Sequence, residues 1–191
     1  MEVVLRTVLP RLLGDISFEV YAHQCKHELL ARLPARLSGY RRWIPDDWRI
    51  VVVVDRDSDD CLHVKRRLER ISGDAGFLTR SSAGGATYSV VNRLAVEELE
   101  AWYFGDWQAV KAAYPRVSPA IPGKAGYRDP DAIRGGTWEQ FERILRRAGY
   151  FTGGLRKIEA ARAIAPHLTP GRTASRSFQV FCDAMREMAD A

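Results

Sequence analysis

The chain has 191 residues, of which 46% are hydrophobic and 28% are charged, a composition typical of a soluble globular protein with a substantial core. Lys and Arg number 29 against 24 Asp and Glu, so a nucleic-acid partner is plausible. No apolar stretch reaches the roughly 18 residues of a transmembrane helix. The three widely spaced cysteines, Cys25, Cys61 and Cys182, fit neither a zinc knuckle nor a disulfide framework. We therefore expect a protein of the reducing cytoplasm with no membrane association.

Apolar spacing predicts alternating helices and strands in the first half of the chain. The predicted elements are a helix over 2–13, a short strand over 17–22, a helix over 26–40, a strand over 49–54, a helix over 60–72 and a strand over 86–92. Strands that alternate with helices of this length favour right-handed βαβ units and a parallel sheet. The fold class expected from the sequence is therefore α/β.

The second half is predicted to be helical. The elements expected are a helix over 95–114 with a break at Gly105, a long ordered loop over 115–136, and helices over 138–148, 155–168 and 177–189. The loop contains too many prolines and glycines for a regular element. We expect one domain, with an α/β core at 1–114 and a loop and C-terminal helical region at 115–191.

Four carboxylates follow the buried apolar run at 50–54. Asp55 and Asp57 come first, and Asp59 and Asp60 lie within the next three positions. Open α/β sheets bind ligands at the carboxyl ends of their strands. Crowded carboxylates repel one another, so a positive charge should lie among them, and hard divalent cations prefer all-oxygen sites. The alternative is that Asp57, Asp59 and Asp60 cap and solvate the next helix.

A second acidic cluster begins just after the strand that ends near residue 92. Glu97 and Glu98 start it, and Trp102 and Asp106 follow Glu98 at intervals of four. If one helix runs through these positions, Glu98, Trp102 and Asp106 share a face. Carboxylates from two adjacent strand ends could form a phosphodiester site with one or two metal ions. The alternative is that the acidic residues favour a helix N-terminus and Trp102 packs in the core.

Basic residues offer contacts for phosphate groups. Arg66 and Arg67 lie on the predicted helix that leaves the acidic loop, and Lys157 follows the Gly153-Gly154 pair at a predicted helix start. Backbone N–H groups at a helix N-terminus favour an anion. The alternatives are that the arginines solvate a helix face and that the glycines only form a turn.

These motifs resemble known families. The strand followed by Asp55-Arg56-Asp57 resembles the acidic motif of Toprim domains, the metal-binding fold of topoisomerases, primases and the ATPase-associated overcoming-lysogenization nucleases. An ordered motif set is similar to the bacterial family called domain of unknown function 4276: Glu98-Leu99-Glu100-Ala101-Trp102 with Asp106, then Gly153-Gly154 and Lys157, Ala160 to Pro166, and Ser175 to Phe181. This resemblance covers nearly the whole chain. It implies a Toprim-like parallel β-sheet flanked by helices, with a C-terminal helical extension.

The resemblance also implies a chemistry. Mg²⁺ or Mn²⁺ would be held by Asp55 and Asp57, with Glu98 as a further ligand. The neighbouring carboxylates would be additional ligands or partners of the ligands: Asp59, Asp60 and Glu97. The metal would promote phosphodiester hydrolysis, and a partner ATPase is expected, since such families are often encoded beside one. A homodimer is a further expectation. No tyrosine is marked as a topoisomerase nucleophile, so hydrolysis is favoured over strand passage.

One departure from the family pattern concerns the general base. Toprim domains begin with a strand that ends in a Glu-Gly pair, whereas residues 2–13, with Leu9-Pro10, resemble the family's first helix. We therefore expect the first strand and its glutamate to be absent from this sequence, and no catalytic residue is assigned. The alternative function is a non-catalytic nucleic-acid-binding or regulatory module. A haloacid-dehalogenase-type phosphatase is less favoured, because Asp59 stands where that family usually has Thr or Val.

Overall fold

The computed structural model describes residues 1–57, 59–96 and 98–190, which form two compact units. We call Ala22–Leu94 the sheet unit, and Met1–Tyr21 together with Ala95–Ala191 the helical unit. The predicted division into 1–114 and 115–191 follows the sequence, whereas these units group the first helix with the C-terminal helices. Among the described residues, no helix combines the length and the apolar character needed to cross a bilayer.

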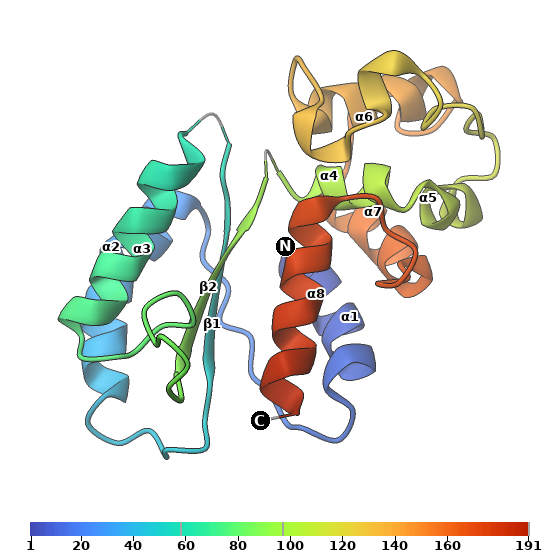
Figure 1. Cartoon of the computed structure of the whole chain (residues 1–191). Coiled ribbons are helices and arrows are strands. Elements are labelled where there is room, and N and C mark those ends of the chain that lie inside the picture. Colours follow the sequence, from blue (N-terminus) through green and yellow to red (C-terminus); the bar gives the residue numbers. More distant parts are fainter. Residues whose placement is uncertain (58, 97, 191) are drawn as a thin grey trace. The chain divides into compact units, whose positions relative to one another are not determined.

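The sheet unit contains two strands and two helices in the predicted alternating order. Its elements are α2 (Lys26–Tyr40), β1 (Ile50–Asp55), α3 (Cys61–Asp74) and β2 (Val90–Ala95). The strands β1 and β2 form a small parallel sheet, and α2 and α3 cover one face of it (Figure 1). The core between these layers is formed by aliphatic side chains, including Leu37, Leu68, Val52 and Val54. The α/β class expected from the sequence is confirmed for this unit.

Two strand predictions differ from the structure. Residues 17–22 alternate between half-buried and exposed side chains, as predicted, but form no strand. The alternation there records burial of Phe18 and Val20 on one side of an extended segment rather than pairing in a sheet. The strand predicted over 86–92 begins only at Val90, and the chain before it turns through Gly84 and Gly85, whose φ values are 56° and 99°.

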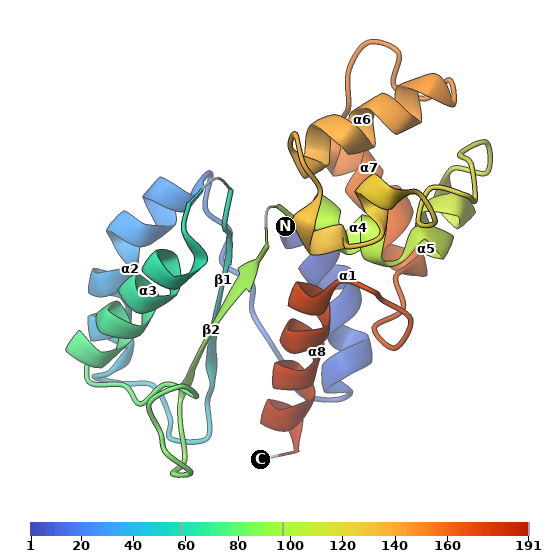
Figure 2. The same ribbon diagram turned by 45° about the horizontal axis from the view of Figure 1, so that its top comes forward.

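The helical unit is formed by α1 (Glu2–Leu13) and the elements after β2. These are α4 (Glu100–Gly105), α5 (Trp107–Ala113), α6 (Thr137–Arg147), α7 (Lys157–Ile164) and α8 (Arg176–Ala189), with short 3₁₀ turns at Ala125–Tyr127, Pro130–Ala132 and Ala165–His167. Helix α1 lies beside α8 (Figure 2) and also packs against α7. Its inward face is formed by Val4, Leu5, Val8 and Leu9. Burial of this aliphatic face explains why α1 joins the C-terminal helices.

The helical segment is interrupted between α4 and α5, at Gly105, where a break was predicted. A Cβ atom at Gly105 would lie 2.7 Å from the backbone nitrogen of Ser175, so glycine permits the close approach of α8. The next residue, Asp106, caps α5. Helix α4 therefore begins after Glu98 and ends before Asp106, so the condition for a shared helix face of Glu98, Trp102 and Asp106 is not met. Trp102 is fully buried and stacks on Phe178 at 4.5 Å, as the core alternative expected.

Candidate functional site

The acidic loop after β1 surrounds a lysine. Lys26, the first residue of α2, donates from Nζ to Asp57 Oδ2 at 2.7 Å, to Asp59 Oδ2 at 2.8 Å and to the Arg56 carbonyl oxygen at 2.8 Å. These contacts use all three protons of the ammonium group. The positive charge expected among the carboxylates is therefore present, and a residue of α2 supplies it. Sequence analysis missed Lys26.

The charges of this loop shift one another's protonation. Burial lowers the pKa of Lys26, but hydrogen bonds to the two carboxylates outweigh that effect and hold the pKa above its ordinary 10.5. The hydrogen bond from Lys26 lowers the pKa of Asp59 below its ordinary 3.8, and the charges of His63 and Arg67 act in the same direction. The charge of Arg67 therefore acts on the acidic loop, while its role in phosphate contact stays a prediction.

The remaining carboxylates of the loop have distinct positions. Asp55 is the last residue of β1 and is half-buried. Asp60 caps α3 by accepting a hydrogen bond from His63 N at 2.7 Å, as the capping alternative expected. Asp57 has a φ of 53°, a left-handed conformation that costs about 1 kcal/mol or more for a non-glycine residue. The contact with Lys26 helps to hold this strained turn in place.

In the second acidic cluster, which lies in the helical unit, Glu98 accepts hydrogen bonds from the start of α6. Glu97 lies outside the described residues. Glu98 Oε2 accepts from Thr137 Oγ1 at 3.0 Å and from Trp138 N at 3.1 Å, so it satisfies backbone and side-chain donors at the start of α6. An acidic side chain at a helix N-terminus is also favoured by the helix dipole.

Lys157 lies near this cluster rather than facing only solvent. Its Nζ is 3.8 Å from Glu98 Oε1, 3.9 Å from Glu100 Oε1 and 4.8 Å from the centre of the Trp138 ring. The lysine side chain is 51% exposed, whereas that of Glu100 is 6% exposed. This ammonium group partly neutralises a buried carboxylate, but its distances are longer than those of a hydrogen bond.

Asp106, the last residue of the predicted face, has a structural role. Its buried carboxylate makes a two-pronged ion pair with Arg172, at 2.7 and 2.9 Å, and accepts from Thr169 N at 2.7 Å. It also accepts from Ala109 N at the start of α5. Because its oxygens are saturated by these donors, Asp106 fixes the loop before α8 to α5.

The structure thus brings Asp57 and Asp59 together in the sheet unit, and Glu98 and Glu100 together in the helical unit. Across residues 1–57, 59–96 and 98–190, no three His, Cys, Asp or Glu side chains are grouped closely enough to hold a metal ion by themselves. A cation at the acidic loop would therefore take part of its coordination from water or from a ligand.

A polar network between α3 and β2 was also missed from the sequence. Lys65 Nζ donates to Glu69 Oε1 at 2.7 Å and to the Asn92 carbonyl oxygen at 2.8 Å. Glu69 also accepts from Asn92 Nδ2 and from the Thr79 hydroxyl. Burial lowers the pKa of Lys65, in spite of its ion pair with Glu69. The Lys65–Glu69 spacing of four was a signal in the sequence for this helix pair, but not for its link to β2.

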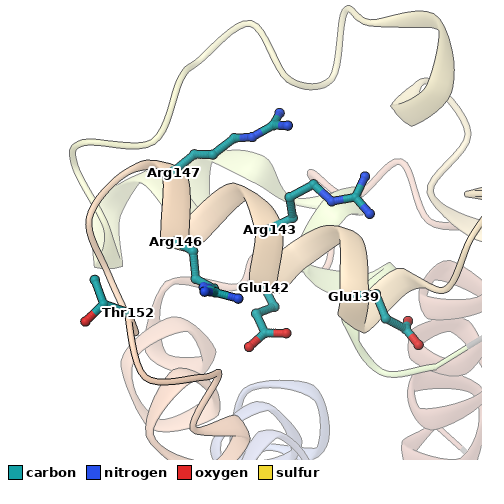
Figure 3. Close-up of a pocket in the computed structure, with 6 residues that line it drawn as sticks. All are labelled: Glu139, Glu142, Arg143, Arg146, Arg147 and Thr152. Atoms are coloured by element: carbon teal, nitrogen blue, oxygen red, sulfur yellow. The ribbon is translucent and has the colours of Figure 1, made fainter.

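Exposed arginines occur in both units. Arg66 and Arg67 are exposed on α3 in the sheet unit. In the helical unit, a surface hollow lies along α6, where Arg143 and Arg147 extend to the same side of the helix (Figure 3). The hollow is lined by Glu139, Glu142, Arg143, Arg146, Arg147 and Thr152. Among the described residues, Arg143, Arg146 and Arg147 form no ion pair with a carboxylate, although Glu139 and Glu142 line the same hollow.

The parallel sheet covered by helices defines an α/β protein with an acidic strand end. The chain belongs to the family described as Domain of unknown function (DUF4276), whose model matches residues 1–186. The resemblance found in the motifs is therefore confirmed at the level of the family. No curated protein and no solved structure matches the chain.

Proposed function

We propose that this protein is a Mg²⁺-dependent phosphodiester hydrolase that acts on nucleic acid through a Toprim-like sheet unit. The observation that carries the proposal is the convergence of Asp57 and Asp59 on one cationic group, at 2.7 and 2.8 Å, beyond the carboxyl end of β1. Mg²⁺ is commonly bound by one or two carboxylates, with water and substrate phosphates completing its coordination. The residues present therefore fit the ion that the family resemblance implies.

The residues of the acidic loop have separate roles in this proposal. Asp57 and Asp59 would hold Mg²⁺, and Asp55 at the strand end would be a further ligand. When bound, the ion supplies charge stabilisation at the phosphate and an acidified water. Arg66 and Arg67 bind the phosphate backbone beside the loop without selecting a sequence. Glu98 is outside the proposed site, because its Oε2 accepts two hydrogen bonds at α6 and its Oε1 faces Lys157.

A second candidate function is nucleic-acid binding without catalysis. The observation that favours it is that Lys26 already supplies a cation to the acidic loop, with three acceptors within 2.8 Å of its Nζ. A protein of this kind would bind nucleic acid through its arginines and would need no metal. An ATPase partner and a homodimer stay predictions for either function.

The test is cleavage of supercoiled plasmid DNA, single-stranded DNA and RNA, with and without Mg²⁺ or Mn²⁺. We expect metal-dependent hydrolysis that is lost in Asp57→Asn with Asp59→Asn. The matched control is Asp46→Asn with Asp47→Asn, because both residues are exposed in the sheet unit and the charge change is the same. p-Nitrophenyl phosphate tests the phosphatase alternative.

The substrate-binding part of the proposal has its own measurement. Arg66→Gln with Arg67→Gln should weaken nucleic-acid binding about tenfold at moderate salt and should reduce the dependence of log K on log salt by about 2 units, because each phosphate contact releases roughly one counterion. Binding without cleavage under every metal condition would favour the non-catalytic function. Neither binding nor cleavage would remove nucleic acid as the substrate class.

A further inference from the structure

Lys26 occupies a position that its local surroundings disfavour. It is the first residue of α2, and Cys25 before it makes no side-chain capping bond. A cation at a helix N-terminus is opposed by the positive end of the helix dipole. The lysine side chain is nevertheless only 18% exposed and makes two ion pairs. The acidic loop, which follows about 30 residues later in the chain, is therefore the reason that the ammonium group is held there.

We propose that Lys26 is the resident counterion of the acidic loop and competes with a divalent cation for Asp57 and Asp59. This inference rests on the proposed function, because it concerns the same carboxylates. In the absence of metal the ammonium group offsets part of the negative charge of the loop and stabilises its turn. In the presence of metal it withdraws, so that the loop carries one kind of cation at a time.

The competition follows from the contact distances. The ammonium nitrogen lies 2.7 and 2.8 Å from Oδ2 of Asp57 and of Asp59, so it occupies the space between the two carboxylates that would hold a metal ion. A divalent cation bound to those carboxylates would place a charge of 2+ close to the positive ammonium group, and this repulsion is strongly unfavourable. Lysine is a point charge on a flexible four-carbon stem, so its ammonium group can turn toward solvent by rotation of side-chain bonds.

The arrangement has a consequence for affinity. Metal binding must replace two good ion pairs and the hydrogen bond to the Arg56 carbonyl oxygen before it gains its own contacts. The wild-type loop should therefore bind divalent cations more weakly than the same carboxylates without the lysine. Metal would be retained best when a phosphate ligand adds further contacts.

The experiment compares Mn²⁺ affinity of the full chain by calorimetry for the wild type, Lys26→Met and Lys26→Arg. Lys26→Met removes the charge but keeps an unbranched side chain, and we expect it to bind Mn²⁺ about tenfold more tightly. Lys26→Arg retains the charge and should stay close to the wild type. Lys124→Met is the matched control, because Lys124 is an exposed lysine of the helical unit. It should also bind like the wild type.

A measurement on the wild type avoids dependence on the folding of the variants. Nitrogen-15 spectra of the lysine side chains should contain a slowly exchanging Lys26 ammonium signal that disappears when Mg²⁺ is added. Equal or weaker Mn²⁺ binding by Lys26→Met, or an unchanged ammonium signal at saturating Mg²⁺, would overturn the inference and leave the proposed metal site standing. If neither the wild type nor Lys26→Met binds metal, the proposed site itself fails as well. Binding by Lys26→Met alone would support the inference but not a metal-loaded wild type.

Discussion

In both acidic clusters one lysine lies near two carboxylates, but the geometry of the contacts differs. Each contains two carboxylates and one lysine, but Lys26 lies within 2.8 Å of both of its carboxylates whereas Lys157 is 3.8 and 3.9 Å from its own. The lysine side chains are 18% and 51% exposed. The first cluster is a hydrogen-bonded ion pair on a strained loop, and the second is a loose neutralisation beside a helix start. Composition alone did not separate them.

The difference lies in what else the carboxylates bind. Glu98 accepts two hydrogen bonds at the start of α6, so its position is fixed by the helix and Lys157 approaches it only as an exposed side chain. Asp57 and Asp59 have Lys26 as their shared partner, and their side chains are 48% and 51% exposed. A carboxylate that is committed to a helix is poorly placed to exchange ligands. The loop carboxylates can exchange one cation for another.

The largest expected loss of stability is at Glu98. Glu98→Ala removes an acceptor from Thr137 Oγ1 and Trp138 N, and should lower the free energy of unfolding by about 1–2 kcal/mol, because helix-capping donors are left unpaired. Glu98→Gln, which keeps an acceptor oxygen, should lose less. Calorimetric melting measures both, and Mn²⁺ affinity should stay within about twofold of the wild type. A large loss of Mn²⁺ affinity in either variant would show instead that Glu98 is a metal ligand.

The next largest expected effect is a difference in the free energy of unfolding between variants of Lys26 and Lys157. Without metal, Lys26→Met should lower the free energy of unfolding by about 1 kcal/mol, since the freed carboxylates are half-exposed and regain water. Lys157→Met should cost less than about 0.5 kcal/mol, because its ion pairs are long and its side chain is exposed. Urea denaturation of both variants tests the comparison directly. Equal losses would mean that the difference in distance has no energetic meaning.

The sequence predicted most helices well because their signals are local. The apolar spacing of α1, α2 and α8 can be recognised within one or two helical turns. The strand before Asp55 was predicted from its β-branched run. The strand predicted over 17–22 failed, because pairing depends on a partner that no local pattern specifies.

The candidate site was predictable only in part, for a related reason. Adjacent carboxylates after a strand are visible in the sequence, and electrostatics required a positive charge among them. Lys26 could not be chosen, because it is about 30 residues away in the chain and is brought to the loop by packing of α2 on the sheet. The Asn92 link to Lys65 and Glu69 was hidden in the same way.

The smallest and most diagnostic expected effect is on pH dependence. The pKa of Asp59 is held below its ordinary 3.8 and that of Lys26 above its ordinary 10.5. A carboxylate whose pKa is lower in the folded protein than in the unfolded chain stabilises the fold at pH values above its unfolded-state pKa. That stabilisation is lost as the pH falls through its folded-state pKa. A lysine whose pKa is higher in the folded protein stabilises the fold at pH values below its unfolded-state pKa. That stabilisation is lost as the pH rises through its folded-state pKa. The contribution of the ion pair is therefore complete between these two ordinary values.

The stability difference between the wild type and Lys26→Met should accordingly be flat from about pH 5 to pH 9 and should shrink below about pH 4, as Asp59 takes up a proton. Melting temperatures of both forms across this range supply the measurement, with Lys124→Met as the control for a general change in charge. A difference that persists unchanged to the acid limit of folding would show that packing of the lysine stem, rather than its charge, stabilises the loop. A difference that changes near neutral pH would instead show that a group other than Lys26 and Asp59 controls the contribution of the ion pair. In either case the acidic loop would lose its distinction from the loose cluster around Lys157.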